Sequence, residues 1–272
     1  FKYIILDESI PVGEARNKII EESQCEFLCF LDDDVEIPIN YFKKAQVVIE
    51  NNPNIDVFGG PDQPKTGGND FQKVLSLVMQ SFFAMGPTRL RHTNIHKNEK
   101  GTEINLILCN LWMRKELFNS GFEFPKNYIR NEENILLAKL DKANKKLLYV
   151  AEMIVFHERK QSIQKLIRVT YLSGKFRTIG FFDEYKTFNL WFLIPQFFLI
   201  SLVLLMTISS NYLYLALLSY LIFVLILSIR ISFKAGLKTK VHLAVICFFI
   251  YNFIYPTGQF SGYISKLLGT RK

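Results

Sequence analysis

The chain has 272 residues, 49% of them hydrophobic, and a formal net charge of +8. Seven of the 33 basic residues, and none of the 25 acidic ones, lie after residue 187, so the charge belongs to the tail. This distribution argues against a nucleic-acid-binding protein, whose basic residues would cluster on the folded domain, and it fits membrane segments flanked by positive charge. The four cysteines lack metal-ligand spacing, which is typical of reduced thiols in a cytosolic domain.

Short apolar runs alternate with amphipathic helices through the first 160 residues. This alternation predicts an α/β fold with a mostly parallel sheet. The polar, basic stretch Thr88–Glu103 is expected to be a loop. We expect strands at Phe1–Leu6, Phe27–Leu31, Ile55–Phe58, Leu106–Met113, Leu147–Val150 and Met153–Phe156, and helices at Glu14–Glu22, Pro38–Asn51, Phe71–Phe83 and Asn131–Asn144.

Three consecutive carboxylates, Asp32, Asp33 and Asp34, follow the strand Phe27–Leu31. Three acids in a row repel one another unless a cation lies among them, and ligands of open α/β sheets gather at the carboxyl ends of strands. Acidic oxygens suit a hard divalent ion that also holds phosphate oxygens. The triplet therefore predicts a metal–diphosphate site, with a solvated acidic loop as the alternative.

Two other polar groups lie at the ends of predicted elements. Glu132 and Glu133 start the helix Asn131–Asn144, where the helix dipole by itself favours negative charge. His157 follows the last strand of the domain. The next helix, Ser162–Phe176, is basic and amphipathic and is expected to lie on a membrane surface.

The tail contains two uncharged spans, Phe188–Ile208 and Tyr212–Ile229, each long enough to cross a bilayer as part of a helical hairpin. Basic residues lie before the first span and after the second but not between them, which places both ends in the cytoplasm. A third apolar segment, at about 241–256, is expected to be interfacial or re-entrant. The predicted domains are residues 1–160, an interface helix and linker at 161–187, and a membrane domain at 188–272, with spans at about 188–208 and 212–230.

These features, in this order and spacing, resemble the family-two glycosyltransferases, which are inverting enzymes of the GT-A fold. The resemblance runs from the start of the chain to Arg177. It implies a GT-A domain that lacks its N-terminal strand–helix units, followed by membrane helices as in bacterial polysaccharide and glycolipid members. The matching pieces are Gly13–Asn17, Phe30–Asp34, Gly59–Pro61, Cys109–Asn110, Gly121–Phe122, Glu132–Glu133, His157–Arg159 and Gly174–Arg177.

The resemblance assigns the acidic triplet to the metal and the donor. Asp32 and Asp34 would form the DXD motif and, with His157, would hold Mg²⁺ or Mn²⁺. Asp32, Asp33 and Arg16 would help to bind a nucleotide-sugar donor, which we expect to be a UDP-sugar.

The resemblance also assigns the proton transfer and the leaving group. Glu133, or Glu132 before it, would take the proton of the acceptor hydroxyl. In the family this base is the Asp of a Glu–Asp pair. This chain has Glu133 at that position, and a Glu side chain is one methylene longer than Asp. Lys175 and Arg177 would neutralise the departing diphosphate.

The expected function is that of a hexosyltransferase at the cytoplasmic face of a bacterial inner (plasma) membrane. It would move a sugar from a nucleotide sugar to a lipid-linked or polysaccharide acceptor, with no nucleic-acid partner. The alternative is a non-catalytic membrane assembly subunit on a degenerate glycosyltransferase scaffold. The Glu-for-Asp departure and the missing first strand–helix unit favour that alternative.

Overall fold

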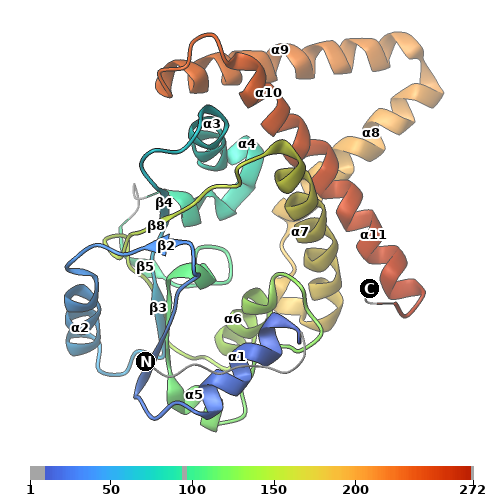
Figure 1. Cartoon of the computed structure of the whole chain (residues 1–272). Coiled ribbons are helices and arrows are strands. Elements are labelled where there is room, and N and C mark those ends of the chain that lie inside the picture. Colours follow the sequence, from blue (N-terminus) through green and yellow to red (C-terminus); the bar gives the residue numbers. More distant parts are fainter. Residues whose placement is uncertain (1–9, 94–96, 271–272) are drawn as a thin grey trace.

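The computed structural model describes residues 10–93 and 97–270. An α/β domain built on two sheets leads into a set of long apolar helices (Figure 1). The strand expected at Phe1–Leu6 lies outside the described residues.

The larger sheet has five strands in the order β1-β6-β3-β7-β5. These are Phe27–Phe30, Leu111–Arg114, Val57–Gly59, Leu147–Tyr149 and Glu99–Lys100. The strand β6 pairs antiparallel with both β1 and β3, whereas β3 and β7 are parallel. The α/β class is confirmed, but the pairing of the described strands is mixed instead of mostly parallel, because β6 inserts antiparallel between two other strands.

A smaller sheet contains the predicted site residue His157. Its order is β2-β8-β4, formed by Val35–Glu36, Val155–His157 and Asp62–Pro64. The strand β8 pairs antiparallel with β2 and parallel with β4. Three segments that are far apart in the sequence are therefore joined side by side at the ends of the main strands.

Alternation along the strands of the larger sheet divides the core into two faces. Val57 packs with α1 (Val12–Glu21), α5 (Lys115–Asn119) and α6 (Glu132–Lys142), whereas the next residue, Phe58, packs with α2 (Tyr41–Asn51) on the other face. In β6, Leu111 packs on the same face as Val57, and Trp112 packs on the same face as Phe58. The helices thus cover both faces of the sheet (Figure 1).

The helix expected at Phe71–Phe83 is present in two parts, whereas the start of the loop expected at Thr88–Glu103 is helical. It forms α3 (Asp70–Met79), α4 (Phe82–Met85) and the 3-10 helix η1 (Gly86–His92). Arg91 and His92 were expected in a polar loop, but both are buried. The side chains of both have polar partners inside the domain, which explains why two basic residues are tolerated there.

The helix α7 (Ile163–Asp183) leaves the α/β domain and packs along α11 (Tyr255–Leu267). The contact is close enough to require glycine. A Cβ on Gly174 would lie 2.1 Å from the carbonyl oxygen of Tyr255, and one on Gly258 would lie 2.0 Å from that of Tyr171. This joint fixes the last apolar helix to the end of the α/β domain.

Three apolar helices, Leu190–Ile208, Ser210–Lys234 and Val241–Leu267, are long enough to cross a membrane. They contain η4 (Leu190–Leu193) with α8 (Ile194–Ile208), then α9 (Ser210–Lys234), and finally α10 (Val241–Phe249), the π-helix η5 (Ile250–Ile254) and α11.

The third of these helices is longer than the short element expected at about 241–256. It continues through Pro256 to Leu267, and Pro256 is the second residue of α11, after the π-helix turn and Tyr255. A wider turn of this kind accommodates a residue that has no N–H to donate.

Candidate active site

The strand pairing of the smaller sheet brings the acidic triplet to His157. Val35 of β2 faces His157 of β8, so the turn before Val35 lies against the imidazole. Nε2 of His157 is 3.0 Å from Oδ1 of Asp34 and 4.0 Å from Oδ2 of Asp32. Asp33 is exposed and is not part of this cluster.

A fourth carboxylate, Asp62, lies behind His157 and was not predicted from the sequence. Asp62 is buried, and its Oδ2 accepts a hydrogen bond from Nδ1 of His157 at 3.1 Å. Arg159 donates to both Asp62 oxygens, at 2.7 and 3.0 Å, and His92 contacts Oδ1. Asp62 directly follows Gly59–Pro61, so its position at a strand end was the signal that sequence reasoning overlooked.

These contacts set the protonation of the imidazole and of its partner. Burial alone would raise the pKa of Asp62, but Arg159 and the two histidines hold it well below its ordinary value. Burial would likewise lower the pKa of His157, but Asp62 and Asp34 raise it above 6.5. A permanent carboxylate at Nδ1 fixes the ring so that Nε2 points to Asp34 and Asp32, the arrangement used behind metal-bound histidines.

Ligand atoms of Asp32, Asp34 and His157 lie within 4.8 Å of one another and could hold a metal ion. Two carboxylates and one imidazole suit Mn²⁺ or Mg²⁺. Asp62, Cys109 and His157 form a second such group. We discount it because Asp62 is engaged by Arg159 and because burial raises the pKa of the Cys109 thiol well above its usual range.

The two glutamates at the start of α6 are buried and face different arginines. Arg16 of α1 forms an ion pair with Glu132 at 2.5 Å, whereas the closest approach of Arg91 to Glu133 is 3.8 Å. Burial and the neighbouring Glu133 raise the pKa of Glu132 despite Arg16. Arg91 was not predicted, and its sequence context gave no signal, since its partners come from distant segments.

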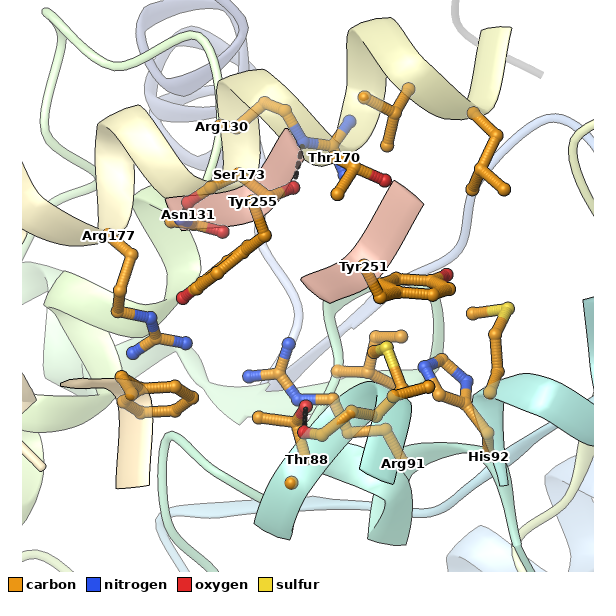
Figure 2. Close-up of a pocket in the computed structure, with 18 of the residues that line it drawn as sticks. Thr88, Arg91, His92, Arg130, Asn131, Thr170, Ser173, Arg177, Tyr251 and Tyr255 are labelled. Atoms are coloured by element: carbon orange, nitrogen blue, oxygen red, sulfur yellow. Dashed lines mark hydrogen bonds between the residues drawn. The ribbon is translucent and has the colours of Figure 1, made fainter. Parts of the chain in front are cut away.

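Six of the predicted site residues line one cavity of about 590 Å³, whereas Asp33, Asp34 and Lys175 do not. Arg16, Asp32, Glu133 and His157 line it, and Glu132 does so beside Glu133. Figure 2 shows another part of its wall, where Arg91 and His92 lie opposite Tyr251 and Tyr255 of the last apolar helix. Groups from four distant parts of the chain thus share one pocket.

Of the two predicted cations on α7, Arg177 lines the cavity and Lys175 does not. Arg177 lines the cavity, but its Nη1 donates to Glu103 at 2.6 Å and its guanidinium lies 4.2 Å from the centre of the Phe192 ring. Lys175 is buried and does not line the cavity. Residues two apart on a helix point to different sides, so α7 cannot direct both cations at one diphosphate.

The glycosyl transferase family 2 model matches residues 1–122 of the chain. Among solved structures, S. aureus TarS residues 1–349 in complex with UDP-GlcNAc is 14% identical, with 97% of this chain and 74% of that chain covered and a TM-score of 0.43. The same protein in complex with UDP is 15% identical, with coverages of 96% and 72% and a TM-score of 0.40. A comparison with curated proteins found no match. Likeness this remote says nothing about the donor or acceptor of this chain.

Proposed function

We propose that the chain, of which residues 1–122 match the glycosyl transferase family 2 model, is an inverting, metal-dependent glycosyltransferase of the cytoplasmic membrane face. Its donor is a nucleotide sugar, which we take to be a UDP-sugar, and its acceptor is lipid-linked or a polysaccharide. The observation that carries this proposal is the convergence of Asp32, Glu133 and His157 on one cavity, with Asp34 in contact with His157.

We assign the general base to Glu133. The acceptor oxygen bonds to the anomeric carbon, the bond from that carbon to the diphosphate breaks with its electron pair, and Glu133 takes the proton of the acceptor hydroxyl. Glu132 is a weaker candidate because Arg16 pairs with it directly, whereas Arg91 stands further from Glu133. The pair with Arg16 suits Glu132 to holding the base in place.

The metal would be held by Asp34, Asp32 and His157. When bound, Mg²⁺ or Mn²⁺ would offset charge on the leaving diphosphate as a Lewis acid. Arg16 and Asp33 are assigned to donor binding with less support, since Arg16 already pairs with Glu132 and Asp33 lies outside the cluster. The positive charge of Arg177 is balanced by Glu103, so we do not assign Arg177 to the diphosphate.

The membrane location is supported by the three apolar helices and by charge. The turn between α9 and α10 carries Lys238 and Lys240, and the turn between α8 and α9 carries no charged residue. Cytoplasmic loops of membrane proteins carry the excess of Lys and Arg. The active site then lies on the side of the basic turn, where nucleotide sugars are available.

Transfer and hydrolysis of a UDP-sugar by membranes that contain the protein will test this proposal. We expect Glu133→Gln to lower the rate by about 10²–10⁴-fold with little change in UDP binding, since general-base catalysis contributes about that much. Asp34→Asn should instead abolish the increase in transfer rate that Mn²⁺ causes in the wild type. Glu116→Gln, an exposed carboxylate on α5, is the matched control and should keep full activity. Full activity of both site variants would refute the assignment.

A further inference from the structure

The cavity continues from the acidic site into the apolar helices. Part of its wall, here called the aromatic arm, is formed by aromatic side chains of α4, η4, α8, α9 and η5. These are Phe82, Phe83, Trp191, Phe198, Tyr220 and Tyr251. Four of them belong to helices that are long and apolar enough to cross a membrane. Trp191 is half exposed, so this arm of the cavity is continuous with a surface that would face lipid.

Arg130 lines the same cavity. Its Nε donates to Oγ of Ser173 on α7 at 3.1 Å, and Figure 2 shows it beside Thr170 and Ser173. Four other arginines line the cavity, and each has a carboxylate within ion-pair distance; they are Arg16, Arg91, Arg159 and Arg177. Within residues 10–93 and 97–270, Arg130 has no carboxylate at that distance. It is therefore a cavity arginine whose charge lacks an ion-pair partner among the described acids.

We propose that the acceptor is an amphiphile with one phosphate group, which binds Arg130 while its hydrocarbon chain fills the aromatic arm. The inference rests on the proposed function, because the reacting hydroxyl of this acceptor would have to reach Glu133. A guanidinium with free N–H groups is suited to a phosphate, and the hydroxyl groups of Thr170 and Ser173 lie next to it. A polysaccharide would not use the apolar arm, whereas a lipid chain gains from burial there.

Binding to the full chain in lipid nanodiscs tests this inference with four probes: dodecyl phosphate, dodecanol, inorganic phosphate, and UDP with Mn²⁺. Arg130→Gln should weaken dodecyl phosphate by about 10-fold or more, since hydrogen bonds to charged groups are worth that much in affinity. It should leave dodecanol and UDP unchanged. Phe82→Ser, at the edge of the aromatic arm, should weaken dodecyl phosphate and dodecanol alike.

The matched control is Arg168→Gln, which removes one positive charge from an exposed position of α7 outside the cavity. An equal loss with Arg168→Gln would mean that general membrane charge, not the cavity, binds the phosphate, and it would overturn the inference. So would equal binding of inorganic phosphate, or a loss of UDP binding in Arg130→Gln, which would place Arg130 in the donor site. Failure of the wild-type protein to bind UDP with Mn²⁺ would refute the proposed function instead.

Discussion

Asp62 gives the sharpest test of how the site is built. Its two oxygens receive four contacts, from Arg159 twice and from His92 and His157 once each. In Asp62→Asn one oxygen becomes an NH₂ group. Because Arg159 donates to both oxygens, one of its N–H groups would face this NH₂ in either orientation of the amide. Arg159 is only 5% exposed and would then hold a buried charge without a counter-ion. Removing one partner of a buried ion pair costs about 3–5 kcal/mol.

That cost should lower the Tm by about 10 °C, at roughly 2–4 °C per kcal/mol for a chain of this size. His157 also loses the carboxylate that orients it, so Mn²⁺ affinity should fall about 10–100-fold. Thermal unfolding in detergent and Mn²⁺ titration measure the two effects separately. Asp62→Asn with Arg159→Met should recover much of the Tm, because no buried charge is left unpaired, but not the Mn²⁺ affinity. An unchanged Tm and Mn²⁺ affinity in Asp62→Asn would refute the reasoning.

Two more predictions concern acid stability and the helix joint. Because the folded pKa of Asp62 lies below the unfolded value of 3.8, its stabilisation is complete above that pH and is lost as the pH falls through the folded pKa. The free energy of unfolding of the wild type should therefore drop more steeply below pH 4 than that of Asp62→Asn, and parallel curves would contradict this. Gly258→Ala should force α11 away from α7 and cost about 1–3 kcal/mol, whereas Thr257→Ala, on the exposed side of α11, should cost less. Equal Tm values for these two variants would contradict the close packing.

Local pattern was enough for the α/β class and for the resemblance to a family whose model matches residues 1–122, because buried strands and strand-end carboxylates consist of consecutive residues. The position of Asp34 next to His157 depends on the β2–β8 pairing, which family resemblance could suggest but periodicity could not. Asp62 was overlooked although it follows a strand end, because it has no adjacent acidic residue and so does not form a motif like the triplet Asp32–Asp34. The site residues themselves stay predictions until variants are assayed.

Contacts between residues that are far apart in the sequence could not be predicted from local pattern. Whether Arg177 is available depends on Glu103, which is remote in sequence. The helical phase of α7, by contrast, was available from spacing and already separates Lys175 from Arg177. The length of the third apolar helix was underestimated because Pro256 and Gly258 were interpreted as breakers. The proline follows a π-helix turn and the glycine is a packing contact.

The π-helix turn at Ile250–Ile254 sets the rotational phase of everything after it. Removing one residue from this turn would restore ordinary helix and rotate α11 by about 100°. Gly258 would then leave the surface of α7, and Tyr255 would leave the cavity wall. A single-codon deletion at this point would therefore break the contact between α7 and α11 without substituting any side chain of either helix.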